Sequence, residues 1–198
     1  MTYDNASTTV RLRAMTLEDC TIIEANPPTP DSDRFSYFGI PMPGRFRKKL
    51  ESGGAHPKPG EVHGLLSIEA EGSYIGFVSW HPVPYGPVDA PAANFGIGLL
   101  ESARGKGYGT TAQKLLVAYL FQTTTVYRVE ASTDVENVAE QRSLEKVGMM
   151  REGVIRGAHY REGRYNDMVL YGITRADYEA ALAAASGTKV TTGFSASR

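Results

Sequence analysis

The chain has 198 residues, of which 41% are hydrophobic and 22% are charged, and its formal net charge is −1. This length and composition suit one α/β domain with a sizeable core, and the near-neutral charge argues against a nucleic-acid binder held mainly by phosphate contacts. The single cysteine, Cys20, excludes an internal disulfide, and no apolar run approaches the length of a membrane span.

The N-terminal half of the chain predicts a strand, a capped helix and a hairpin. Apolar residues alternate with arginines from residue 10 to 14, and Thr16 with Asp19 forms a variant of the helix capping box. The residue before a proline leaves the α region, so this helix should end near Asn26, and Pro82 should end the second strand of the hairpin. In chain order we expect a strand at 10–14, a helix at 16–26, an ordered proline-rich loop at 27–44, a short basic helix at 45–52, a loop at 53–60, and strands at 62–70 and 74–80.

The C-terminal half alternates strands with helices. We expect strands at 94–100, 126–133, 149–155 and 164–174, and helices at 107–122, 137–147 and 175–185. Gly148 should end the second of these helices, and Thr174 should cap the third. This order is typical of a single α+β (mixed α/β) domain over residues 1–185, with a flexible tail at 186–198. The polar start of the chain is unlike a signal peptide, so we expect a cytoplasmic protein.

The hexad Arg104-Gly105-Lys106-Gly107-Tyr108-Gly109 lies between a predicted strand and a predicted helix. The first N–H groups of a helix have no partner within it, and glycines let the backbone approach an anion closely. The hexad therefore predicts a phosphate or pyrophosphate site, although it matches neither a Walker A loop nor the dinucleotide fingerprint. The alternative is a glycine-rich connector without a ligand.

The hexad resembles the R/Q-x-x-G-x-G/A acyl-CoA signature of the GNAT superfamily of N-acetyltransferases. The runs Asp134-Val135-Glu136-Asn137-Val138-Ala139, Leu144-Glu145-Lys146-Val147-Gly148-Met149 and Arg151-Glu152-Gly153 resemble the N-x-A-S-x-R-x-L-E-K-x-G-F…E-G segment of the branch that acetylates ribosomal-protein N-termini. Asp167 with Tyr171 resembles the D…Y ending of that branch. The likeness covers roughly residues 8–180, and it implies a single splayed, mostly antiparallel sheet flanked by helices.

The resemblance implies that acetyl-CoA is the co-substrate and that it lies in a gap between the strands at 94–100 and 126–133. A primary amine would attack the thioester directly, with the Leu100 N–H as the donor to the oxyanion. The implied cofactor-binding residues are Leu99, Leu100, Arg104, Gly105, Lys106, Gly107, Tyr108, Gly109, Thr110 and Asn137.

Two positions depart from the pattern of these relatives. Asn94 stands where they commonly have a glutamate that acts as base, and Glu140 stands where they commonly have a serine that protonates the thiolate. Glu140 could serve as the acid if burial raised its pKa, or it could be a solvated helix-surface glutamate. Ser143 lies one turn later and could replace it only if the helix were rotated or shifted. Weak base machinery favours an α-amine over a lysine amine as acceptor.

Three further residues are candidate acceptor contacts, each with a structural alternative. Trp80 could line the acceptor pocket or belong to the core, and Glu130 could contact substrate or form an ion pair with Arg128. His159 could border the acceptor or lie in a polar turn. The four histidines show no ligand spacing, so we predict no metal.

Several functions remain open from the sequence. The acceptor could be a protein N-terminus or a small-molecule amine. The fold could also use another acyl carrier, either a longer acyl-CoA or an aminoacyl-tRNA, although the near-neutral charge weighs against RNA. A third hypothesis is a non-catalytic CoA-binding module. The sequence leaves open whether the protein is a monomer or a homodimer.

Overall fold

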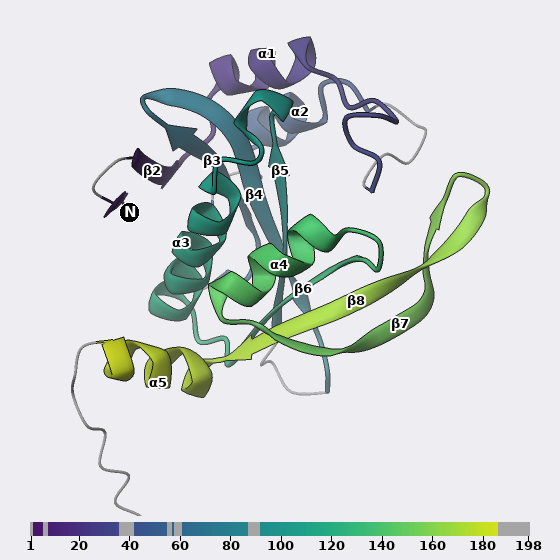
Figure 1. Ribbon diagram of the computed structural model, residues 1–198. Coiled ribbons are helices and arrows are strands. Elements are labelled where there is room, and N and C mark those ends of the chain that lie inside the picture. The colour runs from purple at the N-terminus through teal and green to yellow at the C-terminus, as the bar shows by residue number, and fades with distance from the viewer. Residues whose placement is uncertain are drawn as a thin grey trace, which may run out of the picture.

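A computed structural model describes residues 2–5, 8–35, 42–54, 57, 61–86 and 92–185 (Figure 1). The strands are β1 (Thr2–Asn5), β2 (Thr8–Arg13), β3 (Gly64–Ala70), β4 (Ser73–Val83), β5 (Ala92–Leu99), β6 (Arg128–Asp134), β7 (Met150–Arg161) and β8 (Arg164–Thr174). The helices are α1 (Leu17–Ala25), α2 (Arg45–Glu51), α3 (Tyr108–Thr123), α4 (Val138–Val147) and α5 (Arg175–Ala185), with a short 3₁₀ helix, η1 (Glu101–Ala103), before α3.

The strands form one sheet in the order β1-β2-β3-β4-β5-β6-β8-β7. In the described chain, every neighbouring pair is antiparallel except β5 and β6, which are parallel and pair at Ala93–Val129 and Asn94–Glu130 alone. Beyond these two pairs the strands separate, leaving a gap that widens toward Leu99. The prediction of a splayed, mostly antiparallel α+β fold is confirmed.

Helices cover the two faces of the sheet differently (Figure 1). On one face, α3 and α4 bury Leu116, Leu120 and Leu144 against the strands. On the other face, α1 and α2 pack against Leu65 and Phe77 around a smaller apolar cluster. The sheet therefore separates an α3–α4 face from an α1–α2 face, and the gap between β5 and β6 connects them.

The predicted helix ends are confirmed because their signals are local. Thr16 and Asp19 exchange the two hydrogen bonds of a capping box at the start of α1. Thr174 accepts from the Asp177 N–H at 3.2 Å at the start of α5, and Gly148 ends α4 with a φ of 98°.

Four strand predictions were incomplete or wrong. The strand β1 was missed, and the strand expected at 10–14 is β2, which begins two residues earlier. Pro82 does not end β4, which continues to Val83. The strand β3 pairs with β4 only as far as Trp80, so at Pro82 the missing N–H breaks no hydrogen bond to β3. The strand β7 continues to Arg161 rather than residue 155, since pairing with β8 sustains it across two register shifts.

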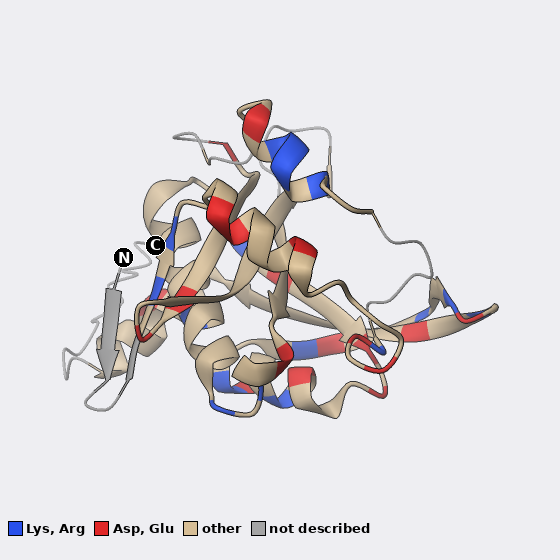
Figure 2. Cartoon of the chain, turned by 90° about the horizontal axis from the view of Figure 1, so that it is seen from above, with Lys and Arg blue, Asp and Glu red and all other residues tan. Residues whose placement is uncertain are grey.

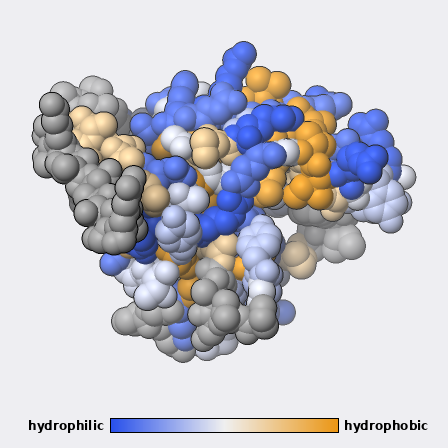
Figure 3. Space-filling model, turned by 90° about the horizontal axis from the view of Figure 1, so that it is seen from below, coloured by the Kyte–Doolittle hydropathy of each residue, from blue (hydrophilic) through white to orange (hydrophobic). Residues whose placement is uncertain are grey.

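The hairpin of β7 and β8 forms an arm at the edge of the sheet. Its strand β7 exposes Met150, Val154 and Ile155. Figure 3 shows that apolar side chains also gather in a patch on the underside of the molecule. Acidic and basic residues are interspersed over the helices and along this arm (Figure 2). No helix in the described chain is long and apolar enough to cross a bilayer. The expected tail at 186–198 and parts of the loops at 27–44 and 53–60 lie outside the described residues.

Candidate functional site

The glycine hexad forms the turn before α3 and leaves a row of backbone donors free. Gly105 and Gly107 have φ angles of 75° and 82°, which favour glycine over other residues. Within the described chain, no acceptor bonds the amides of residues 105–110, and the Thr111 N–H is the first to donate, to the Gly107 carbonyl at 3.2 Å. These amides and the exposed Lys106 can receive an anion, as the sequence predicts.

The start of α3 packs directly on the end of β5. A Cβ atom at Gly109 would lie 3.2 Å from Leu99 Cδ1, so the absence of a side chain permits this close approach. The Tyr108 hydroxyl donates to Glu71 at 3.0 Å, which ties the same turn to the β3–β4 hairpin. The free amides therefore lie at the wide end of the gap.

The Arg104 side chain turns away from these amides. Its guanidinium donates to the Leu99 carbonyl at 2.9 Å and 3.1 Å, to Asp33 at 3.0 Å and to the Ser32 carbonyl. The expectation that this charge lies beside the anion site is not met in this structure, because carbonyls and a carboxylate of another segment hold it.

The Leu100 amide is not free, and its expected role as oxyanion donor is wrong for this conformation. It donates to the Ile75 carbonyl of β4 at 2.9 Å. Consecutive residues of a strand direct their backbone groups to opposite edges, so the N–H and carbonyl of Leu99 face the gap. The bonds from Arg104 to the Leu99 carbonyl agree with this orientation.

A polar cluster closes the narrow end of the gap. The Glu130 carboxylate accepts from Arg128 at 2.9 Å, from the Tyr85 hydroxyl at 2.7 Å and from the Asn94 amide at 3.2 Å. Arg128 also pairs with Glu152 at 2.5 Å. Val129 and Ala131 face the α3–α4 core, so alternation places this cluster on the α1–α2 face.

The predicted pair of Glu130 and Arg128 is present, and Glu130 is only 3% exposed. No pattern in the sequence pointed to Tyr85, which follows β4 in a proline-rich stretch, or to Glu152 as the second partner. Gly172 leaves space for the pair of Arg128 and Glu152, because a Cβ atom at residue 172 would collide with both side chains.

A second polar network joins α3 to α4. Gln113, which is fully buried, donates to the Glu140 carboxylate at 2.6 Å and accepts from Ser143 at 2.8 Å. Ser143 also bonds Thr110 in the first turn of α3 at 2.8 Å. Burial raises the pKa of Glu140, which the hydrogen bond from Gln113 only partly offsets. Glu140 is therefore a half-buried, hydrogen-bonded group rather than a solvated surface glutamate.

Asn137 caps α4 in this structure. Its side-chain oxygen accepts from the Glu140 N–H at 3.3 Å, and its amide donates to Thr133 at 3.0 Å. Its expected contact with acetyl-CoA stays a prediction. The oxygen and the nitrogen of its side-chain amide both have partners, which fix the orientation of the side chain.

The structure places Trp80 in the core, which is one of the two alternatives from the sequence, and places His159 within a strand. The Trp80 ring is 2% exposed in the core and packs edge-on against Tyr119, so it does not line an acceptor pocket. His159 lies within β7 rather than in the turn, and burial and the charge of Arg161 lower its pKa.

A segment that we call the bridging segment, residues 29–35, spans the wide end of the gap. On the β5 side, Arg104 holds its Ser32 and Asp33. On the β6 side, the Arg161 guanidinium donates to the Arg34 carbonyl at 2.8 Å and to Asp134 at 2.7 Å. The sequence showed neither contact, because the partners are far apart in the chain and no local pattern connects them.

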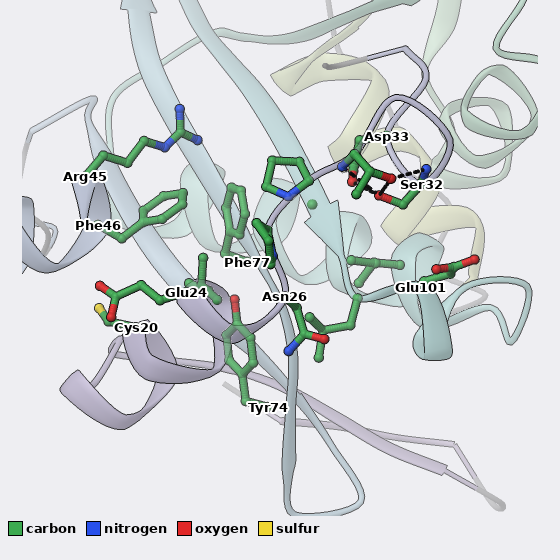
Figure 4. A pocket seen from close by; sticks show the side chains of 18 of the residues that line it. Cys20, Glu24, Asn26, Ser32, Asp33, Arg45, Phe46, Tyr74, Phe77 and Glu101 are labelled. Carbon is green, nitrogen blue, oxygen red and sulfur yellow. Dashed lines mark hydrogen bonds between the residues drawn. The ribbon is translucent and has the colours of Figure 1, made fainter. Parts of the chain in front are cut away.

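A pocket of about 490 Å³ lies beside β5 on the α1–α2 face (Figure 4). Its walls come from α1, the bridging segment, α2 and the strands β4 and β5, with Phe46, Phe77 and Tyr74 as its aromatic residues. It reaches Leu99 and Leu100, so it opens on the same strand end as the gap.

Comparisons with known proteins bear on this arrangement. The family described as acetyltransferase (GNAT) domain matches residues 9–150. YjcK of Bacillus subtilis, named a probable N-acetyltransferase, is 30% identical over 134 residues, which cover 68% of this chain and 70% of that protein. YdaF of the same organism is 29% identical over 119 residues, 58% of this chain, and the match spans 63% of YdaF, slightly less than two thirds.

Two solved structures share the fold. Spermidine N-acetyltransferase from Vibrio cholerae, in complex with CoA and spermine, has a TM-score of 0.72 at 20% identity, covering 86% of this chain and 98% of that chain. Mycobacterium smegmatis RimJ, in complex with CoA-disulfide, has a TM-score of 0.68 at 21% identity, covering 90% of each chain. At these identities the likeness concerns the fold.

Proposed function

Because the chain belongs to the GNAT acetyltransferase family, we propose that it transfers an acetyl group from acetyl-CoA to a primary amine. One observation carries the proposal: β5 and β6 part after Asn94 and Glu130, and free amides lie at the wide end of the resulting gap. A solved spermidine acetyltransferase and RimJ, both with the same fold, were determined with CoA or a CoA disulfide.

The amides of residues 105–110 would hold the diphosphate of the donor, with Lys106 adding a full charge beside them. The donor supplies an acetyl group activated as a thioester, and transfer forms a C–N bond, breaks the C–S bond and releases the CoA thiol. The Leu99 N–H, which faces the gap, replaces the Leu100 N–H as our candidate for binding the carbonyl oxygen as it gains charge.

The amine would approach from the α1–α2 face, where Asn94 lies. Glu130 accepts the side-chain N–H of Asn94, which leaves the Asn94 Oδ1 to accept an N–H of the incoming amine. We therefore assign Asn94 to binding the amine and Glu130 to positioning Asn94. Most of the rate enhancement would come from holding amine and thioester together.

Glu140 is our candidate for the proton donor to the departing sulfur. It lies in the first turn of α4, which follows the β6 wall of the gap, and burial raises its pKa, which favours the protonated form. Gln113 would fix the carboxyl group in place through the bond at 2.6 Å.

An α-amine is the acceptor that this machinery favours. Deprotonating an alkylamine of pKa ≈ 10.4 at pH 7 costs about 4.6 kcal/mol, whereas an α-amine of pKa ≈ 7.8 costs about 1.1 kcal/mol. Glu130, the carboxylate at the narrow end, already accepts three donors from the described chain. The cytoplasmic location, the single domain over residues 1–185 and the monomeric or homodimeric state stay predictions.

Calorimetric titration with acetyl-CoA, followed by thiol release with a panel of amines, tests the proposal. Acetyl-CoA should bind much more tightly than S-acetylpantetheine, which lacks the diphosphate, and thiol should be released faster with α-amines than with alkylamines. Binding without turnover would instead support a CoA-binding module. An absence of acetyl-CoA binding would favour another acyl carrier.

A pair of glycine variants isolates the anion site. Gly107 and Gly163 have φ angles of 82° and 77°, and neither would bring an added Cβ within 4 Å of another atom. Alanine should cost each about 1–2 kcal/mol of backbone strain. Gly107→Ala should therefore weaken acetyl-CoA binding about tenfold, while Gly163→Ala, at the β7–β8 turn, should leave it unchanged. Equal affinities for the two variants would remove the hexad from donor binding.

A further inference from the structure

The pocket beside β5 indicates which kind of amine the protein would accept, whereas the acetyl-CoA site does not. It lies on the α1–α2 face, from which the amine would enter, and it ends at Leu99 and Leu100. Its floor includes Gly98, and a Cβ atom there would lie 2.7 Å from the Phe77 ring. The missing side chain therefore lets the Phe77 ring lie directly against β5, where it forms part of the pocket wall.

The walls of this pocket are mainly apolar and aromatic. The rings of Phe46 and Phe77 lie 4.7 Å apart at a tilt of 56°, and Ile23 and Met42 complete the apolar surface. Rings at this spacing form a surface that another ring or a branched aliphatic group covers well. The volume of about 490 Å³ leaves ample room for a group of that size.

Tyr74 adds one polar group that is open to a ligand. Its side chain is only 7% exposed, and its hydroxyl has no hydrogen-bond partner among the residues that the structure describes. Figure 4 shows this hydroxyl directed into the pocket. Burial raises the pKa of Tyr74, so the hydroxyl stays neutral and can donate to an oxygen atom of the occupant.

Two of the three described carboxylates that line the pocket are already held by arginines. Glu24 pairs with Arg47 at 2.8 Å, and Asp33 pairs with Arg104 at 3.0 Å. Glu101 lies exposed at the outer edge. Among the described residues, the interior of the pocket therefore offers aromatic surface and a neutral hydroxyl, and Glu101 is the one carboxylate without an arginine partner.

We propose that the acceptor is a primary amine whose carbon skeleton carries an aromatic or large aliphatic group, and that Phe46, Phe77 and Tyr74 bind that group. This inference rests on the proposed function and adds the substrate class to it. The same chemistry is found in the first residue of a peptide and in a free arylalkylamine.

The test compares kcat/KM for L-phenylalaninamide and L-alaninamide at saturating acetyl-CoA, followed by thiol release. Both substrates present an α-amine, so the comparison isolates the side chain. Phenylalaninamide should be preferred about tenfold or more, because burying a phenyl group is worth at least that factor. Two further substrates are tested, a peptide that begins with Phe and free phenethylamine. The one with the higher kcat/KM shows whether the acceptor is a peptide N-terminus or a free arylalkylamine.

Matched variants assign the preference to this pocket. Phe77→Leu should reduce the preference for phenylalaninamide at least about threefold, since it removes an aromatic wall. Phe121→Leu, which removes a buried ring that stacks on Tyr178 away from the pocket, should leave the preference unchanged. Phe46→Leu, at a half-buried position on α2, provides a second variant should Phe77→Leu fail to fold.

Four results would overturn the inference. Equal kcat/KM for alaninamide and phenylalaninamide, or spermidine as the best acceptor, would reject the aromatic class while leaving amine acetylation intact. An unchanged preference in both Phe77→Leu and Phe46→Leu would remove this pocket from acceptor binding. Acetyl-CoA binding without turnover of any amine would reject the proposed function itself.

Discussion

The buried ion pair between Arg161 and Asp134 predicts a large loss of stability when the arginine is replaced by methionine. Their side chains are 1% and 2% exposed and 2.7 Å apart. Arg161→Met would leave the Asp134 carboxylate buried beside the Glu136 N–H, and removing one partner of such a pair costs about 3–5 kcal/mol. In a protein of this size that corresponds to a fall in Tm of about 6–20 °C.

Urea denaturation at pH 7 measures this loss, and a second arginine provides the control. Arg34 pairs with Glu136 at 2.9 Å, but their side chains are 59% and 52% exposed, so Arg34→Met should cost less than about 1 kcal/mol. In a double-mutant cycle, Asp134→Asn should restore part of the stability lost in Arg161→Met, because the buried charge is gone. Equal losses for Arg161→Met and Arg34→Met would refute the reasoning.

Two further predictions concern other parts of the chain. Burial raises the pKa of Glu140 in the folded protein, so its ionisation opposes folding above the unfolded pKa of about 4.5. Glu140→Gln should therefore raise the free energy of unfolding at pH 8 more than at pH 4, and a constant difference across this range would contradict it. Gly64→Ala should lower stability by about 1–3 kcal/mol, because the new Cβ would overlap the Trp80 ring, whereas Gly96→Ala meets no atom closer than 4.0 Å and should be tolerated. Urea unfolding of the two glycine variants compares them, and equal losses would show that packing against Trp80 is not responsible.

Local signals in the sequence were enough to predict most of the helices and the glycine turn that carries the free amides. The capping residues Thr16 and Thr174 act within one helical turn, and Gly148 supplies the positive φ at the end of α4. The hexad works the same way, since its glycines set the turn before α3. Each of these features depends on neighbours a few residues away, so it can be recognised without knowing the fold.

The acceptor side could not be predicted to the same extent, because its geometry depends on which strands become neighbours. Asn94 and Glu130 were each singled out, but nothing in the sequence showed that they are opposite one another where β5 meets β6. The Leu100 amide was misassigned for a related reason. Which strand edge an amide faces depends on the register with β4, and that register places it on Ile75.

Arg104 shows both local and tertiary effects within one motif. Its place before the glycines is a local property, and the free amides that follow it are in the expected position. The direction of its side chain is decided instead by Ser32 and Asp33, which approach because Arg161 holds the other end of the bridging segment through the Arg34 carbonyl. The position of free backbone amides can therefore be predicted from glycine spacing, whereas a side-chain charge in the same motif must be located from the tertiary contacts that compete for it.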